Sequence, residues 1–401
     1  METPDLAQVI NNKQYSLPRN RSPQLKPLFT ERMQELLPDK EDYQKYLEIL
    51  KVPPVKSIRC NKLKISPTEL KNKLEKKNWK ISQPWKNYPE VMIVKGKTQS
   101  KETNNKKTQL NSKLQQTSNS SLTTPNQSRE DLKSSLTAIR EGGRGMVADI
   151  KSPSQNLIDL EPGELGRSLE HLLGYYYIQE LASMLPIIAL NPKQDEMILD
   201  LCSAPGSKTT QTASEMENTG TIIANEVSMG RLKILASNLE RCGVTNTIIT
   251  KKEGIALCKK LKRENFQFDR ILVDAPCSGE GTLRSSPKTY LMWNPKTIKA
   301  LSRLQKTLVS SALEILKPNG TLIYSTCTHA PEENEEIVDF ILQKFKNKIE
   351  LELLRLPIKP RQGIKTWQDN TYSKEVKKCA RIYPHDNNTE GFFIAKFKKT
   401  K

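Results

Sequence analysis

Two of the seven cysteines, Cys277 and Cys327, follow consecutive short apolar runs, where an α/β enzyme carries its reactive side chains. Cys277 belongs to residues 274–279 (DAPCSG), three residues after a carboxylate that ends an apolar run. Cys327 ends the next run, just before residues 331–335 (PEENE), which have the composition of a helix start. A thiol near a helix N-terminus can have a lowered pKa and act as a nucleophile. A single buried cysteine is more often inert, but two thiols near one acid favour covalent chemistry.

A second candidate site is the segment 200–209, which reads DLCSAPGSKT. Its small residues would let a backbone turn approach a ligand, and a following helix would offer free N–H groups. It matches neither GxGxxG nor a P-loop, and a plain strand-to-helix turn is the alternative. Acidic residues recur after successive apolar runs at Glu226, Glu253 and Asp274. Each alone could be a solvated loop residue, but their recurrence favours a ligand site, with Glu226 placed to bind a ribose.

These side chains can meet only if a sheet aligns the ends of their strands. Apolar runs at residues 197–201, 221–224, 247–250, 270–274 and 321–325 alternate with helical patterns at 231–241 and 301–316. This alternation predicts βαβ units with a parallel sheet, and residues 392–397 predict a last strand. Leu172, Tyr176 and Met184 lie at helical spacing and predict a helix there.

The N-terminal part predicts a small α+β module. Strand candidates occur at residues 57–61 and 91–94, and Ser66 can cap a helix that has Pro67 at its first position. Residues 97–137 are polar and predict a disordered insertion, more in keeping with a solvated linker than an RNA-binding tail. We therefore divide the chain into an extension (1–40), a module (41–165) and a larger α/β domain (166–401).

Composition narrows the function classes. The 401 residues include 64 Lys and Arg against 45 Asp and Glu, a formal net charge of +19, which favours a polyanion such as nucleic acid or serves solubility. No apolar run approaches the ~18 residues of a membrane span, and the first 30 residues lack a signal-peptide core. The three histidines and the absence of C-x-x-C argue against a metal site, and the cysteines predict reduced thiols inside the cell.

Together the motifs resemble the Sun-domain (Fmu/Sun, RsmB/Nop-like) family of RNA cytosine-5 methyltransferases. Besides the two segments above, the resemblance rests on residues 325–327 with 332–335, on 381–385 (RIYPH) and on 391–393 (GFF). It is strong from about residue 167 onward and weak over 58–94. It implies an α/β fold with a Rossmann-like S-adenosylmethionine methyltransferase sheet of seven strands, preceded by a small α+β RNA-binding module.

The resemblance implies S-adenosylmethionine as cofactor, with Glu226 on its ribose and Glu253 toward its adenine. Two departures are Glu253, where the family usually has Asp, and Ser207, where it usually has a second glycine. The full set of expected cofactor-binding residues is Cys202, Ser203, Ala204, Pro205, Gly206, Ser207, Lys208, Glu226, Arg231, Glu253 and Asp274.

The resemblance also assigns catalytic roles. A thiolate that adds to C6 of cytosine makes C5 nucleophilic toward the methyl sulfonium. In the family this thiolate is the Thr-Cys residue, here Cys327, while the Pro-Cys residue, here Cys277, assists product release and Asp274 supports proton donation at N3. In DNA cytosine-5 methyltransferases the Pro-Cys residue is the nucleophile, so spacing alone leaves the order open.

The expected substrate is tRNA, with rRNA as the alternative and an RNA-binding ribosome assembly factor as the rival of another class. Trp79, Trp85 and Tyr88 are candidates for base stacking or for core packing. We expect a monomer with no membrane or metal partner and a cytoplasmic location, or a nucleolar one if the host has a nucleus. No PUA-like extension is expected after Phe397.

Overall fold

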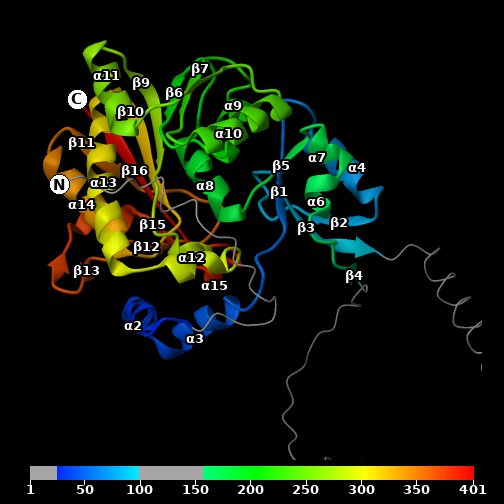
Figure 1. Cartoon of the computed structure of the whole chain (residues 1–401), viewed down its shortest axis with the longest axis horizontal. Helices are drawn as coiled ribbons and strands as arrows, with labels where there is room; N and C mark the ends of the chain where they lie inside the picture. The colour runs from blue at the N-terminus through cyan, green and yellow to red at the C-terminus, as the bar shows by residue number, and fades with distance from the viewer. Residues whose placement is uncertain (1–24, 99–156) are drawn as a thin grey trace, which may run out of the picture.

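The computed structural model describes residues 25–98 and 157–401, which form a large α/β sheet and a smaller antiparallel sheet (Figure 1). Residues 1–24, which make up most of the predicted extension, lie outside the described residues. The predicted insertion at 97–137 also lies outside them, apart from its first two residues. Within the described part of the chain, no helix combines the length and apolar content needed to cross a membrane.

The large sheet realises the predicted alternation of apolar runs and helices. Its parallel part pairs β8, β7, β6, β9 and β10 in that order, and β16 joins β10 antiparallel. Their bounds are β6 (Met197–Asp200), β7 (Thr221–Asn225), β8 (Thr247–Thr250), β9 (Phe268–Asp274), β10 (Leu316–Thr326) and β16 (Phe392–Lys399). The carboxyl ends of the parallel strands therefore all lie at one edge of the sheet.

The expected number of seven strands is wrong, because this sheet has nine strands within residues 25–98 and 157–401. Short strands extend the sheet beyond β16. The segments that form these strands contain no long apolar run in the sequence. They are β11 (Ile349–Glu352), which pairs with residues 396–399, β15 (Ala380–Ile382), which pairs with residues 392–394, and β12 (Arg361–Gln362), which pairs with β15. A separate hairpin joins β13 (Thr366–Trp367) to β14 (Asn370–Thr371).

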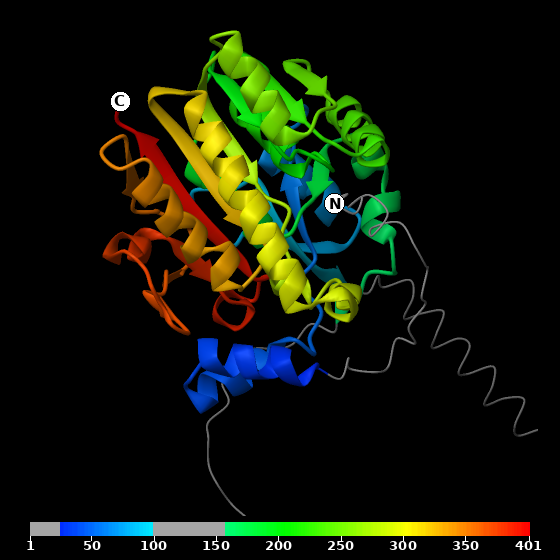
Figure 2. The same ribbon diagram turned by 60° about the vertical axis from the view of Figure 1, so that its left-hand side comes forward.

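Helices cover both faces of the large sheet, which explains why its strands are continuously apolar. Ile271 and Val273 of β9 pack into one core and the intervening Leu272 into the other. The first core is covered by α11 (Gly254–Arg263), α13 (Pro295–Glu314) and α14 (Glu335–Lys344), and Figure 2 shows α13 lying across the sheet. The second is covered by α8 (Leu181–Leu190) and α9 (Ser207–Glu215), with α10 (Met229–Cys242) packed beside them.

The small sheet has the strand order β2-β3-β1-β5, with β4 paired to β3. Its elements are β1 (Ser57–Cys60), α4 (Pro67–Glu75), β2 (Trp79–Ser82), β3 (Val91–Thr98), β4 (Leu157–Ile158) and β5 (Tyr176–Ile178). The predicted cap is present, because Ser66 Oγ accepts a hydrogen bond from the Glu69 N–H at 3.2 Å. Trp79 and Trp85 are 4% and 7% exposed, so both are core residues rather than base-stacking platforms.

The helix predicted from the spacing of Leu172, Tyr176 and Met184 is wrong. Leu172 instead ends α7 (Leu169–Leu172), Tyr176 begins strand β5, and Met184 lies in the separate helix α8. The short helix α6 (Glu164–Arg167) precedes this segment. Gly174 breaks the helical path at φ +72°, where a Cβ would lie 1.9 Å from the Arg241 carbonyl oxygen. Because β5 pairs with β1, the small sheet extends to residue 178, beyond the predicted boundary at residue 165. The division of the chain at residues 40 and 165 stays a prediction.

The first described helices, α2 (Pro27–Leu36) and α3 (Lys40–Ile49), pack on the large domain. Phe29 and Tyr46 share a buried cluster with Trp293 and Tyr383. Arg32 of α2 forms a bidentate ion pair with Glu332, at 2.8 and 3.0 Å. The remaining short helices are η1 (Glu280–Thr282), α12 (Pro287–Met292), η2 (Pro331–Glu333), η3 (Lys374–Lys378) and α15 (Pro384–Asn387).

Candidate active site

The two predicted catalytic thiols lie side by side at the carboxyl ends of β9 and β10, with their Sγ atoms 3.3 Å apart. The strands are parallel neighbours, with Asp274 opposite Ser325, so the loops that follow leave from the same edge. The Gly281 N–H then donates to the Cys327 carbonyl oxygen at 2.9 Å and ties the two loops together. The two thiols therefore lie next to each other at one edge of the sheet.

A buried carboxylate supports the loop that carries Cys277. Glu333 of η2 accepts hydrogen bonds from the Ser278 N–H at 3.1 Å and from Gln305 Nε2 at 2.8 Å. Burial raises the pKa of Glu333 to about 7. The hydrogen bond with Cys327, burial and the charge of Glu333 together raise the pKa of the Cys277 thiol well above its ordinary value. Sequence reasoning gave Glu333 no role, although it lies in the PEENE segment, and no sequence signal marked Gln305.

A second buried carboxylate holds the far side of the same loops. Glu280 accepts hydrogen bonds from Trp293 Nε1 at 2.7 Å and from Thr328 Oγ1 at 3.1 Å. Thr328 Oγ1 also lies 2.7 Å from Ser278 Oγ. Thus residues after both thiols are joined through side chains as well as through the backbone.

A cavity of about 260 Å³ lies beside the turn between β6 and α9. Gly206 has φ +102°, and a Cβ there would lie 3.0 Å from Leu235 Cδ1, so the turn is suited to glycine. The lining residues are Ser183, Asp200, Cys202, Ser203, Ala204, Pro205, Ser207, Lys208 and Asp274. The structure therefore brings together every residue of the predicted 202–208 segment, with Gly206 shaping the turn.

Asp274 connects this cavity with the thiol strands. One of its carboxylate oxygens lies 2.8 Å from Lys208 Nζ, and the other accepts a hydrogen bond from Ser325 Oγ at 2.7 Å. Lys208 also donates to Ser183 Oγ at 3.0 Å. Asp274 therefore links the residues that line the cavity to the strand that precedes Cys327.

Asp200 is a site residue whose role sequence reasoning missed. One carboxylate oxygen accepts from Thr209 Oγ1 at 2.7 Å, and the other is buried without a hydrogen-bond partner among the described residues. Burial raises the pKa of Asp200 to about 7, and the neighbouring charge of Asp274 adds to this shift. A buried acceptor without a partner, on a residue that lines a cavity, fits a ligand with a cationic or hydrogen-bond-donating group.

The three remaining predicted cofactor residues differ in placement. Glu226 is buried and accepts from the Ser228 N–H at 2.8 Å, and its ion pair with Arg231 is 3.3 Å long. Arg231 also donates to the Ala204 carbonyl oxygen, so both reach the turn. Glu253 is exposed and caps α11 by accepting from the N–H groups of residues 255 and 256, and it does not line the cavity.

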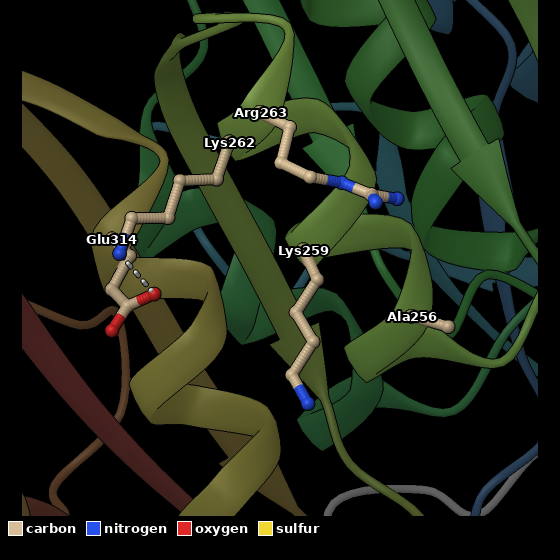
Figure 3. Close-up of a pocket in the computed structure, with 5 residues that line it drawn as sticks. All are labelled: Ala256, Lys259, Lys262, Arg263 and Glu314. Atoms are coloured by element: carbon tan, nitrogen blue, oxygen red, sulfur yellow. Dashed lines mark hydrogen bonds and ion pairs between the residues drawn. The ribbon is translucent and has the colours of Figure 1, made fainter.

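A larger hollow of about 760 Å³ lies between α11 and α13 (Figure 3). Its lining residues are Ala256, Lys259, Lys262, Arg263 and Glu314, all of them exposed. Lys262 forms an ion pair with Glu314 at 3.0 Å, which Figure 3 marks by a dashed line. It contains none of the predicted site residues and no buried polar group, so the smaller cavity is the better candidate.

One cluster of possible metal-ligating side chains within the described residues is Asp42, His385 and Asp386. The Arg361 guanidinium already lies among them, 2.6 Å from Asp42 and 2.7 Å from Asp386. A side-chain cation thus fills this place and fastens α3 to α15.

Residues 187–398 match the family model described as 16S rRNA methyltransferase RsmB/F. The chain belongs to this RsmB/F family. It is 43% identical over 273 residues to the tRNA (cytosine(49)-C(5))-methyltransferase of Pyrococcus abyssi, covering 64% of this chain and 86% of the relative. It is 31% identical over 376 residues to ribosomal RNA small subunit methyltransferase F of Erwinia tasmaniensis, covering 93% of this chain and 63% of the relative. It spans about half the length of several other bacterial F-type relatives.

Solved structures agree with this family membership. NSun6 from Pyrococcus horikoshii, solved with the S-adenosylmethionine analogue SFG, has 27% identity and a TM-score of 0.67 over 94% of this chain and 98% of its own. A methyltransferase homologue from the same organism has 28% identity and a TM-score of 0.64, covering 94% of this chain and all of its own. The predicted family, Rossmann-like methyltransferase fold and S-adenosylmethionine cofactor are thereby confirmed.

Proposed function

We propose that this chain, an S-adenosylmethionine-dependent RNA cytosine-5 methyltransferase, acts on tRNA. The observation that carries the reaction is the pair of thiols 3.3 Å apart, beside a carboxylate that also contacts the cofactor cavity. The preference for tRNA is supported by the relative from Pyrococcus abyssi, of which the chain covers 86%, against 48–63% for several F-type relatives. The description of the family model keeps rRNA as the second candidate.

In the proposed reaction the Cys327 thiolate adds to C6 of the target cytosine, and the electron pair moves toward N3, which is protonated with the help of Asp274. The nucleophilic C5 then accepts a methyl group, the chemistry that S-adenosylmethionine supplies. Loss of the C5 proton, breakage of the C6–S bond and return of the N3 proton then release 5-methylcytosine and the Cys327 thiolate. Cys277 assists this release from its place 3.3 Å from the other sulfur.

The cofactor would be held by the residues that line the small cavity. The unpaired oxygen of Asp200 would accept from a donor of the cofactor, and the backbone of residues 202–208 would surround it. Glu226 would accept from its ribose hydroxyls. Arg231 would orient Glu226 through their 3.3 Å ion pair, and Glu253 would at most act from the edge of the site.

The small sheet and its helix α4 would contribute RNA binding, consistent with the net charge of +19. We further propose a monomeric protein in the cytoplasm.

The direct test is transfer of labelled methyl groups from S-adenosylmethionine to separated tRNA and rRNA of the host, followed by nucleoside identification. Labelled 5-methylcytosine in the tRNA fraction is the expected result. Label in rRNA alone would instead establish the second candidate. RNA and cofactor binding without labelled 5-methylcytosine in either fraction would overturn both and favour the assembly-factor alternative.

A further inference from the structure

The loop that carries Cys277 is gripped by two side chains from distant elements. Gln305 of α13 donates from the same Nε2 atom to the Pro276 carbonyl oxygen and to Glu333 Oε2, both at 2.8 Å. Glu333 in turn accepts from the Ser278 N–H. The two side chains therefore hold the residues on both sides of Cys277, and we call them the Gln305–Glu333 clamp.

Packing alone does not explain this clamp. Both side chains are fully buried, and the Gln305 side-chain carbonyl oxygen has no hydrogen-bond partner among the described residues. A buried acceptor without a partner destabilises the folded state, whereas apolar side chains of similar size would fill the space without that penalty. The clamp is better explained by the loop geometry that it imposes.

The clamp treats the two thiols differently. Its hydrogen bonds are made to the residues on either side of Cys277. Two titratable groups raise the pKa of the Cys277 thiol, Cys327 foremost and Glu333 through its charge. Besides burial, the charge of the Glu280 carboxylate, which lies in η1, raises the pKa of Glu333. A negative charge beside a thiol disfavours its thiolate form.

We propose that Gln305 and Glu333 are positioning residues that separate the roles of the two thiols. They hold the loop on both sides of Cys277 and so fix this thiol beside Cys327, and the Glu333 carboxylate disfavours a thiolate at Cys277. This inference rests on the proposed function, because it concerns the use of these thiols in methyl transfer.

The test compares the alkylation rates of Cys277 and Cys327 by iodoacetamide in the full chain, resolved by mass spectrometry, with and without Glu333→Gln. At pH 8.5, where Glu333 is ionised, the substitution should raise the Cys277 rate roughly tenfold relative to Cys327, equivalent to about one pKa unit. At pH 6, where the Glu333 carboxyl is largely protonated, the difference should shrink. An unchanged ratio at both pH values would overturn the proposal.

Matched variants separate charge from folding. Glu332→Gln removes a carboxylate from the same turn, but this one pairs with Arg32 at 2.8 Å, so the alkylation ratio should stay unchanged. Glu333→Asp keeps the charge and should restore most of the original ratio. A shift of the same size in Glu332→Gln, or none of the expected restoration in Glu333→Asp, would contradict a specific effect of Glu333.

Gln305→Met provides a second route if Glu333→Gln does not fold. It removes the two hydrogen bonds that Gln305 Nε2 donates, at similar side-chain size, and it should lower kcat for methyl transfer several-fold while KM for RNA stays within about twofold. An unchanged kcat would count against the clamp. Alkylation needs neither RNA nor turnover, so the absence of methyl transfer by the unmodified chain would refute the proposed function without deciding the alkylation test.

Discussion

The thiol loops and the cofactor turn lie at the same edge of one sheet, yet they are built in opposite ways. Around Cys277 and Cys327, buried carboxylates accept hydrogen bonds from the backbone and from neighbouring side chains. Around residues 202–208 the backbone turn encloses a cavity, and a carboxylate oxygen of Asp200 has no hydrogen-bond partner among the described residues. In the first region both oxygens of each buried carboxylate, Glu280 and Glu333, accept hydrogen bonds, whereas in the second an unpaired carboxylate oxygen lies beside a cavity that a ligand can occupy.

This difference matches the two tasks. A thiolate must approach one carbon atom with little error, so the loops that carry it gain from a fixed geometry. A cofactor that enters and leaves at each turnover needs a cradle whose hydrogen-bonding groups it can satisfy itself. Asp274 joins the regions, because one of its oxygens contacts Lys208 and the other Ser325.

The sharpest separation of the two regions should come from Cys327→Ala. Removing the proposed nucleophile should lower methyl transfer at least about a thousandfold, because the thiolate that forms the C6 adduct in the proposed reaction is lost. Cofactor affinity, measured by calorimetry, should change less than about twofold. A comparable loss of cofactor binding would mean that the two regions do not act separately.

Cys277→Ala should lower turnover about a hundredfold while leaving the first bond-forming step possible. The expected product is a covalent protein–RNA adduct that survives denaturing electrophoresis, because release from C6 is impaired. Accumulation of that adduct in Cys327→Ala instead would reverse the roles of the two thiols, as spacing alone allows.

Glu226→Gln should act on the cofactor region alone and weaken cofactor binding roughly tenfold, since a hydrogen bond to a charged group is lost. The matched control is Glu253→Gln, which removes a carboxylate that caps α11 outside the cavity lining. That control should cost about 1 kcal/mol of stability and leave cofactor affinity within about twofold. Equal losses of cofactor affinity in both variants would instead indicate that Glu253 also belongs to the cofactor site.

The last prediction concerns stability rather than catalysis or binding, and it concerns the unpaired carboxylate of Asp200. Because its pKa rises from 3.8 to about 7 in the folded chain, the folded state binds more protons than the unfolded state between these values. Stability should therefore fall as pH rises from about 4 to 7, and Asp200→Asn should remove this loss.

Thermal unfolding without cofactor at pH 5 and pH 8 measures the effect of Asp200→Asn. The variant should gain about 2 kcal/mol relative to the unmodified chain between the two conditions. A difference that is independent of pH would show that Asp200 does not titrate in this range.

The comparison of sequence with structure follows the same division. Periodicity and motif composition are local, so the parallel strands, the turn at 202–208 and the Ser66 cap were predictable from the residues themselves. The helix expected through Tyr176 failed for the complementary reason. Spacing of four residues fits a helix, but pairing with Cys60 across the chain favours a strand there.

The sequence by itself determined which strand ends carry thiols and acids, and so the family, the fold class and the cofactor. Only the tertiary structure brought Cys277 within 3.3 Å of Cys327, fifty positions away, and placed Gln305 and Glu333 behind them. It also decided that one oxygen of Asp200 has no hydrogen-bond partner among the described residues and that Glu253 caps α11 rather than lining the cavity. These outcomes depend on contacts between distant segments, which are set when helices pack on a sheet and leave no trace in local spacing.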